Sequence, residues 1–588
     1  MLCAQLAQFM PYLSLFVIKL PVMNTHILQK LPISLLLIGG FFLVPLFTLL
    51  KGQPIQHFWP QWLTVALGTL ASLSFISGQF WQKVHLPQSI FIPLGLMGIV
   101  IIQWMLGMLH SNAVSLYAVL YLLWAAAMVL LGQKMRQDIG LGQLVHYLAW
   151  FSVAAGMLVS IFMLLGALAG IGITLQASHV MVSLIVSIVS AVHLLVQGKL
   201  NVKVAIPMIA VALAGLAYAG GSIGWAIVAA IVLVAIVIQA VAIKHRTGSR
   251  QKRDQVRLAL ALIPAYALIA WAVSRWLGHH LDTPDIGHIA AVWRQGLQLF
   301  MGKPLLGVGL GNVAWQSFLA IDAPAINGAV GVYGNTQNMF IQLMAEMGTG
   351  AALILVVGYI GWLKNIDWRH PAPDTWWLVT TLVALLCYGF FDAHLQYAYI
   401  AGFAALLLGA GDEKTSEVSL PRAGIATSAV LATVLTVNLS ASLWSNHQLQ
   451  KALPLAHKSK LTLEESHLFD TKLEWVHRHS LLAPYAEQVF AETIPVNHHD
   501  LKSKIWLNDA VLRFHPTHRV AYKQVVLLEL NGEHKAAVQL LKFTLNAYPI
   551  KFSQQLALLP MSSWQDYLNV LSEARPPKAA IKRATKTY

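Results

Sequence analysis

The 588-residue chain is 57% hydrophobic and only 11% charged, and it carries a formal net charge of +15. Its mean hydropathy of +0.63 excludes an ordinary soluble protein and indicates a membrane protein with many spans. Much of the positive charge is expected to follow membrane topology, so it does not indicate nucleic-acid binding. The two cysteines, Cys3 and Cys387, exclude a disulfide framework, and the histidines show no metal-ligand spacing, so no metal site is expected.

Residues 1–30 form an N-terminal extension of uncertain character. The apolar stretch 4–18 is short and contains Pro11, and no clean cleavage site of a signal peptide follows it. Met23 would make an ordinary cytoplasmic start. The extension is therefore either the product of a start codon assigned too early, at Met1, or a segment that lies at the membrane interface.

Residues 31–443 have the pattern of a transmembrane domain. A helix needs about 20 apolar residues to cross the bilayer, and about thirteen such runs follow one another here. They lie roughly at 31–50, 62–80, 88–109, 113–132, 146–170, 178–197, 203–220, 222–243, 258–276, 338–363, 375–391, 396–411 and 424–443. The expected fold class is all-α: a polytopic membrane protein with about thirteen transmembrane helices.

Basic residues between the runs predict the orientation. They gather in four loops, all of which follow an even-numbered run: 134–136, 199–203, 244–257, and Lys364 with Arg369. The positive-inside rule places these loops in the cytoplasm. The loop 277–337 and everything after residue 443 are then expected in the periplasm, with the spans in the bacterial inner membrane.

The loop 277–337 is too long for a simple connector, and long loops tend to be functional. It contains the amphipathic pattern AAVWRQGLQLF and then GKPLLGVGLGN, in which Pro304 ends a helix and alternating glycines permit tight turns. The glycines are a weak signal for a phosphate cradle, but no strand precedes them, so neither a Rossmann nor a P-loop site is expected. The alternative is a re-entrant loop on the membrane surface.

Residues 444–588 are expected to form a separate periplasmic helical domain. Pro516 and Pro549 are 33 residues apart, and 520–549 contain two amphipathic helices around Asn531 and Gly532, close to the tetratricopeptide period. One such unit cannot bury its own apolar face, so residues 448–515 are expected to supply partner helices. The module either binds a partner or packs on its own membrane domain.

Two segments, WRQGLQLFMGKPLLGVGLGN and NTQNMFIQLMAEMG, resemble the paired signature of the O-antigen ligase/polymerase superfamily. Within it, the chain is most similar to bacterial O-oligosaccharyltransferases of the PglL type, also in FFDAHLQYAYIAGFAALLLG and in the order of its domains. The resemblance implies transfer of a glycan from a polyprenyl-pyrophosphate carrier to an acceptor hydroxyl, without a cofactor, nucleotide or metal. It implies a periplasmic acceptor protein or the lipid A core as the partner.

The chain departs from the family pattern at three positions that would do chemistry. The family's loop motif usually reads His-Ser/Thr-His-Asn, but residues 335–338 read Asn-Thr-Gln-Asn. Ile223 stands where a mid-membrane motif usually has Arg, and Ile289 stands where an Arg usually precedes the loop Trp. Asn and Gln do not titrate, so Gln337 can orient an acceptor hydroxyl but cannot take its proton.

The remaining polar residues near these motifs are the candidates for the site. The catalytic candidates are Arg294, Gln337, Asn338, His394 and His288, and the substrate-binding candidates are Lys303, Arg275 and Asn335. Arg294 would neutralise the pyrophosphate; the alternative is a solvated or snorkelling cation. His394 is the first choice for the missing base and His288 the second. Glu346 lies in an expected span, where a buried carboxylate is costly unless it pairs locally.

The leading function is O-linked protein glycosylation with a lipid-linked glycan. An O-antigen ligase or a glycan polymerase would differ only in its acceptor. The three replaced residues also leave open a non-catalytic homologue that binds a lipid-linked glycan or a partner. A secondary transporter is disfavoured, because the first nine runs contain almost no ionisable residue at mid-depth.

Overall fold

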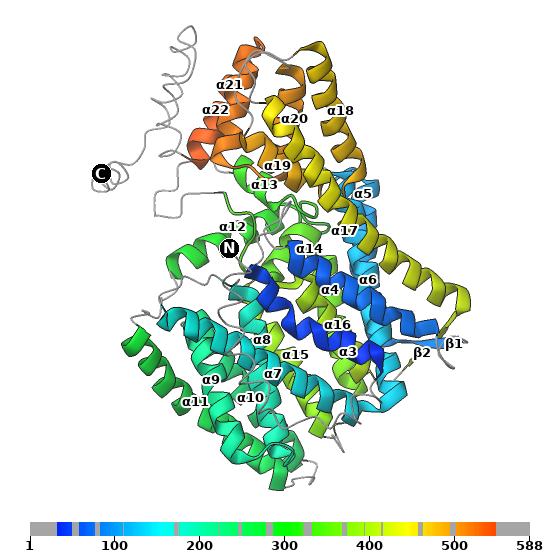
Figure 1. The fold of residues 1–588 in the computed structure, drawn as a ribbon, viewed down its shortest axis with the longest axis vertical. Helices are drawn as coiled ribbons and strands as arrows, with labels where there is room; N and C mark the ends of the chain where they lie inside the picture. The colour runs from blue at the N-terminus through cyan, green and yellow to red at the C-terminus, as the bar shows by residue number, and fades with distance from the viewer. Residues whose placement is uncertain are drawn as a thin grey trace.

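The computed structural model describes most of the chain. The described residues are 32–49, 58–76, 83–109, 111–169, 175, 177–220, 223–244, 250–277, 286–320, 332–366, 368, 373–392, 394–412, 415–456, 462–493 and 501–548. The uncertain extension 1–30 lies outside them. Within these ranges nearly all elements are helices, which confirms the all-α polytopic class (Figure 1).

The helices of the membrane part follow the expected runs. They are α3 (Ile33–Gly39), η1 (Gly40–Leu49), α4 (Phe58–Ser72), η2 (Leu73–Ile76), η4 (Gln88–Ile90), α5 (Phe91–Met105), α6 (Asn112–Ile139), α7 (Leu141–Leu168), α8 (Ala177–Val196), α9 (Val202–Gly220), α10 (Ile223–Lys244), α11 (Arg250–Leu277), α14 (Met339–Asn365), α15 (Pro373–Tyr388), η5 (His394–Gln396), α16 (Ala398–Gly411) and α17 (Arg422–Ala456). Each of the predicted runs overlaps at least one of these helices.

Fewer helices than predicted are long enough to cross a membrane by themselves. Among the described residues, 8 helices have the required length and hydropathy, and three shorter apolar helices lie at Ile33–Thr48, Ile223–Val237 and Ala398–Gly411. The predicted runs 62–80 and 375–391 contain α4 and α15, of 15 and 16 residues. The apolar runs therefore give the positions of the helices correctly, but not the length of regular helix in each run.

Helices α6 and α16 pack with their backbones in contact. A Cβ added at Gly132 would lie 2.0 Å from the carbonyl oxygen of Leu406, and one added at Gly409 would lie 1.9 Å from that of Val129. Small residues at helix interfaces permit such close approach within a membrane. This contact fixes two helices whose other faces line a cavity described below.

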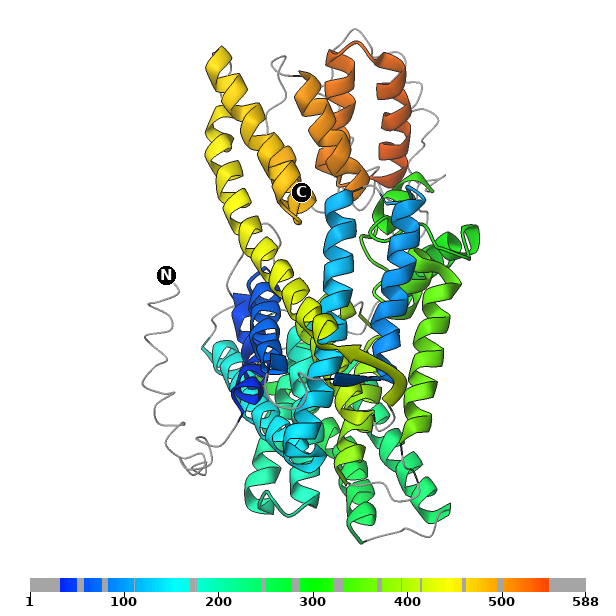
Figure 2. The ribbon, with the colours of Figure 1, turned by 90° about the vertical axis from the view of Figure 1, so that its right-hand side faces the viewer.

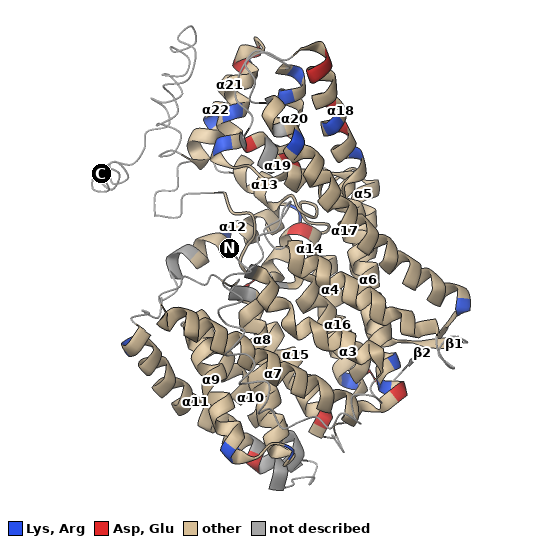
Figure 3. Ribbon diagram, in the orientation of Figure 1, with Lys and Arg blue, Asp and Glu red and all other residues tan. Residues whose placement is uncertain are grey.

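Two short strands that the sequence pattern did not indicate, β1 (Lys83–Pro87) and β2 (Thr415–Pro421), pair antiparallel beside α17 (Figure 2). Lys83 lies opposite Pro421, and His85 lies opposite Ser419. Both strands fall in loops that the basic residues assign to the same membrane side. Figure 3 shows Lys and Arg at the end of the membrane helices away from the C-terminal helices, and again among the C-terminal helices.

The long helix α17, of 35 residues, leads out of the membrane part to five further helices (Figures 1 and 2). These are α18 (Leu463–His479), α19 (Ala483–Thr493), α20 (Leu501–Phe514), α21 (His518–Leu530) and α22 (His534–Ala547). Two helices of the loop 277–337 are described, α12 (Ile286–Gly302) and α13 (Val313–Leu319). Helix α13 contacts α20 and α22, with Phe318 against the rings of Phe543 and Tyr548. The C-terminal helices thus pack on their own chain.

Candidate functional site

The glycine-rich segment after α12 folds against a break in α14. Gly348 has φ 73° and ψ −167°, which interrupts the helix and frees carbonyl groups. The backbone N–H groups of Val308 and Gly309 donate to the carbonyls of Ala345 (2.8 Å) and Glu346 (3.0 Å). These amides are used inside the protein, so the segment satisfies the broken helix and is not a phosphate cradle.

Close backbone approach explains two of the glycines. A Cβ at Gly307 would lie 2.4 Å from the carbonyl carbon of Glu346, and a Cβ at Gly348 would lie 2.2 Å from the carbonyl oxygen of Leu305. Both residues also have positive φ, 68° and 73°. A side chain at either position meets backbone that cannot move aside, and it adopts a conformation that favours glycine.

Two buried side chains lock this junction. Gln103 of α5 donates from Nε2 to the carbonyls of Leu306 (2.6 Å) and Glu346 (2.8 Å), and its Oε1 accepts from the N–H of Leu310 (3.2 Å). The Glu346 carboxylate accepts from the N–H of Gly311 (3.1 Å) and from Nε2 of Gln342 (2.8 Å). Glu346 therefore pairs locally, which is the condition under which the sequence permits a buried carboxylate in this span.

A cavity of about 560 Å³, here called the shaft, lies between α5, α6, α14 and α16. Most of its wall is aliphatic and includes Ile92, Leu96, Val100, Ala118, Ala125, Val129, Leu355, Ala404 and Leu408. Its polar wall residues are Tyr117, Tyr121, Asn335, Gln342, Glu346, Tyr359, Gln396, Tyr485, Gln488 and His515. Along α6 the wall extends from Val114 to Val129, which is about 22 Å at 1.5 Å per residue. The shaft is a long apolar space with hydrogen-bonding groups toward the C-terminal helices.

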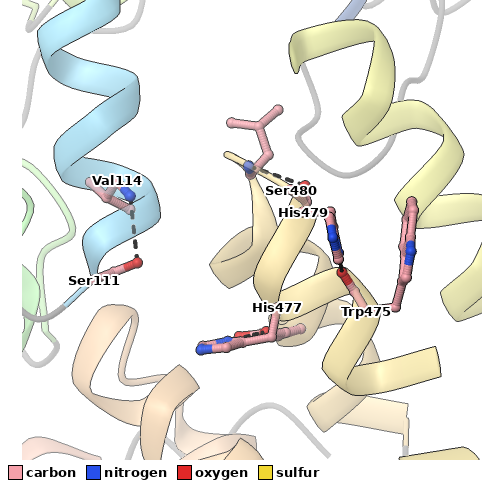
Figure 4. A network of polar contacts seen from close by, with 8 residues as sticks. Ser111, Val114, Trp475, His477, His479 and Ser480 are labelled. Carbon is pink, nitrogen blue, oxygen red and sulfur yellow. Dashed lines mark hydrogen bonds and ion pairs between the residues drawn. The ribbon is translucent and has the colours of Figure 1, made fainter. Parts of the chain in front are cut away.

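A second cavity of about 630 Å³, here called the polar cleft, shares Val114, Leu310, Gly311 and Phe514 with the shaft. Its further wall includes Trp104, Ser111, Asn112, Asn312, Asn438, His477, Arg478, His479, Glu487 and Arg513. Figure 4 shows Ser111 and Val114 on α6 across from His477 and His479 at the end of α18. The two cavities meet where the glycine-rich segment, α6 and α20 come together.

An ion pair crosses the C-terminal side of the polar cleft. Nδ1 of His477 lies 2.9 Å from Oε1 of Glu487, whose side chain is only 2% exposed. The hydrogen bond to this carboxylate raises the pKa of His477 above its ordinary value, although partial burial opposes the rise. His479 lies against the ring of Trp475, with 4.9 Å between ring centroids. The cleft therefore presents charge and aromatic faces where the shaft presents hydrocarbon.

The motif 335–338 lies beside the shaft, but its residues have different surroundings. Asn335 lines the shaft. Gln337 is exposed with φ 50°, and its N–H donates to Oδ1 of Asn335 (3.1 Å). Asn338 caps α14: its Oδ1 accepts from the N–H groups of Phe340 (3.0 Å) and Ile341 (3.1 Å). A helix cap explains Asn at position 338 without a catalytic role.

The predicted cations lie elsewhere. Arg294, Lys303 and Arg275 are exposed, and none of them is among the described wall residues of either cavity. His288 and His394 belong to α12 and η5, but their side chains lie outside the described part of the structure. Of the eight predicted site residues, Asn335 is the one that the structure places on a described cavity wall.

The sequence did not single out the contribution of the C-terminal helices. Tyr485, Gln488 and His515 line the shaft, and His477 and Glu487 line the polar cleft. From the sequence, the histidines of this region indicate only that a metal-ligand spacing is lacking. The signal available in the sequence was the position of His515 directly before Pro516. A proline marks the end of the preceding helix, so the pattern predicts a histidine just after α20.

Residues 395–558 match a protein-family model described as "Virulence factor membrane-bound polymerase, C-terminal". The match begins at η5 and includes α16, α17 and the C-terminal helices that line both cavities. It supports the O-antigen ligase/polymerase superfamily, and with the membrane helices it supports a multi-pass membrane protein. No curated protein and no solved structure is significantly similar to the chain.

Proposed function

We propose that the protein transfers a glycan from a polyprenyl-pyrophosphate carrier to an acceptor hydroxyl at the periplasmic face. The shaft is the observation that carries this proposal. A polyprenyl-linked donor has a long hydrocarbon chain and a strongly polar head, and the shaft offers an aliphatic wall along α6 and polar groups toward the C-terminal helices. The family match adds support, because polymerases of this superfamily act on lipid-linked glycans.

In this proposal the hydrocarbon chain lies against the aliphatic wall, where burial of apolar surface stabilises it by roughly 25 cal/mol per Å². Asn335, Gln342 and Gln488 supply hydrogen bonds to the head. The leaving pyrophosphate gains charge, which preorganised cations stabilise. Arg478 and Arg513 line the polar cleft beyond the shared wall and supply positive charge from that side.

The acceptor enters by the polar cleft. We propose O-linked protein glycosylation first, with a Ser or Thr hydroxyl of a periplasmic protein as acceptor. A glycan polymerase is the second candidate, because the family match names a polymerase and the cleft is rich in groups that bind sugar hydroxyls. The lipid A core is the third acceptor. The three differ in the acceptor alone and share the donor site.

A cross-linking experiment tests the donor site. The full chain in nanodiscs would be irradiated with a glycan-bearing polyprenyl pyrophosphate that has a diazirine in its lipid chain. Cross-links are expected on α5, α6 and α16, and Ala125→Phe, which fills part of the shaft, should reduce them at least tenfold. Ala404→Phe, from another helix of the wall, serves as a second variant if the first does not fold.

The matched control is Ala261→Phe, on an exposed face of α11 away from the described shaft wall. It should leave cross-linking unchanged. Equal cross-linking in Ala125→Phe, Ala404→Phe and the unmodified chain would overturn the donor site. The acceptor is read separately, by expressing the chain with a lipid-linked glycan and detecting a glycosylated periplasmic protein, a lengthened glycan or a capped lipid A core. A chain that binds donor and gives none of the three products is a non-catalytic homologue.

A further inference from the structure

We propose that His515, from the C-terminal helices, takes the proton of the acceptor hydroxyl during glycan transfer. This inference rests on the proposed function and names the base that the loop motif lacks. His515 lines the shaft, and the residue before it, Phe514, lines both the shaft and the polar cleft. The imidazole thus lies where a donor in the shaft meets an acceptor in the cleft.

His515 also touches the segment that carries the altered motif. A Cβ added at Gly334 would lie 3.3 Å from Cε1 of His515, so the ring rests against the residue next to Asn335. In the related enzymes this motif is expected to carry a histidine, but position 337 holds an exposed glutamine. The packing of α20 places the imidazole of His515 beside this motif, although the two segments are far apart in the chain.

The backbone around His515 is held firmly. Its N–H donates to the carbonyl of Val511 (2.7 Å), the following Pro516 is buried, and Tyr548 donates a short hydrogen bond to the Pro516 carbonyl. Thr517 caps α21 by accepting from the N–H of Val520 (3.3 Å). These bonds fix the backbone of His515 and so limit where its imidazole can reach.

The charge state of His515 suits a base. Burial lowers its pKa below the ordinary value, and the Glu492 carboxylate opposes this in part. The imidazole is therefore mostly neutral at pH 7. Glu492 itself accepts hydrogen bonds from Thr517 (3.2 Å) and Gln488 (3.4 Å).

Among the described residues, five other titratable groups line the shaft: Tyr117, Tyr121, Glu346, Tyr359 and Tyr485. Burial raises the pKa of Tyr485 to about 12, so its phenol keeps its proton at neutral pH and cannot serve as the base. The carboxylate of Glu346 already accepts from Gly311 and Gln342. Both donors to Glu346 belong to the junction of the glycine-rich segment with α14, whereas the ring of His515 lies against Gly334, beside the altered motif. This geometry favours His515 as the base.

Proton transfer to His515 accompanies the transfer of the glycan. The acceptor O–H gives its proton to a ring nitrogen of His515, and its oxygen forms a bond to the anomeric carbon of the donor sugar. The bond from that carbon to the pyrophosphate oxygen breaks, and its electron pair stays on the polyprenyl pyrophosphate. His515 afterwards releases the proton to water.

Transfer and donor cross-linking, measured on the same variants of the full chain, test the proposal. His515→Ala and His515→Gln should reduce transfer by about 100- to 10,000-fold, the usual contribution of a positioned base, and leave donor cross-linking within twofold. His467→Ala, an exposed histidine of α18, is the matched control and should transfer normally. Adding Gln337→His to His515→Ala should restore part of the transfer, because the second imidazole returns to the loop position.

The dependence of transfer on pH gives a further test, because a purely structural role of His515 would not change it. Because the pKa of His515 is lowered, the unmodified chain should lose transfer only on acidification below the ordinary imidazole pKa of about 6.5. The residual transfer of His515→Gln should lack this loss. Transfer within threefold of normal in His515→Ala, or a large loss in His394→Ala or His288→Ala alone, overturns the assignment. An unmodified chain that transfers glycan to no acceptor also overturns the assignment of His515. Failed donor cross-linking overturns the proposed function itself.

Discussion

The shaft and the polar cleft are similar in volume and share a wall, yet their chemistry is opposite. The aliphatic wall of the shaft comes from membrane helices, and the charged wall of the cleft comes mainly from α18, α19 and α20. The membrane helices thus build an apolar space, and the C-terminal helices add charged and hydrogen-bonding groups to it. A transfer reaction between a lipid-linked donor and a polar acceptor needs both kinds of wall, side by side.

The shared wall is the most sensitive place in this arrangement. Gly348→Ala should disrupt both cavities, because its Cβ meets the Leu305 carbonyl oxygen at 2.2 Å. The residue also has φ 73° and ψ −167°, a conformation that costs non-glycine residues about 1–3 kcal/mol. The expected result is a large loss of folded protein, of donor cross-linking and of transfer, measured by thermal unfolding and by the cross-linking assay.

Gly532→Ala is the matched control for this variant. Gly532 has φ 82° in the α21–α22 turn, but a Cβ there meets nothing within 4 Å. Its cost should be limited to about 1–2 kcal/mol of backbone strain. If both variants unfold alike, the close approach of the glycine-rich segment to α14 is not what shapes the two cavities.

The second prediction separates the cavities by changing the cleft alone. His477→Ala should destabilise the C-terminal helices by about 1–3 kcal/mol, because the carboxylate of Glu487, only 2% exposed, loses its partner, and donor cross-linking in the shaft should stay unchanged. Asp509→Asn, which removes the exposed pair with Arg513 (3.0 Å), should cost at most about 1 kcal/mol. Denaturant unfolding followed by a probe in the C-terminal helices measures both.

The same ion pair predicts how stability depends on pH. The pKa of His477 is raised in the folded protein, so the pair's contribution is fully present below about pH 6.5 and is lost as the pH rises through the raised value. The difference in unfolding free energy between the unmodified chain and His477→Ala should therefore be larger at pH 5.5 than at pH 8.5. A difference that is equal at both pH values would show that His477 acts by packing alone.

Local patterns in the sequence predicted the membrane helices, because apolar length is a property of each segment by itself. They also placed Asn335 and the glycine-rich segment near the site. They could not place His515, because its contact with Gly334 depends on how α20 packs over the loop. The pairing of β1 with β2 escaped prediction for the same reason, since each strand is short and its partner lies far away in the chain.

Substitutions of Asn338 distinguish a helix cap from a catalytic amide, and their expected effect on stability is moderate. Asn338→Ala removes the acceptor of two N–H groups at the start of α14 and should cost about 1 kcal/mol. Asn338→Asp keeps this acceptor but loses the hydrogen bond from Nδ2 to the carbonyl of Phe390 (3.2 Å), so it should retain transfer at a modest cost in stability. Loss of transfer in the Asp variant with normal unfolding would instead support the catalytic role predicted from the sequence.

The smallest effect is expected at Arg294. The sequence predicted that this cation neutralises the pyrophosphate, but its side chain is exposed and is not among the described wall residues of either cavity. Arg294→Ala should therefore change donor cross-linking and transfer by less than threefold, whereas the double variant R478A/R513A, which removes charge from the cleft wall, should reduce transfer more. A tenfold or larger loss in Arg294→Ala, with Arg294→Lys only partly active, would mean that a planar guanidinium of α12 reaches the donor head. The charge would then come from the loop side of the shaft, and the cleft would serve the acceptor alone.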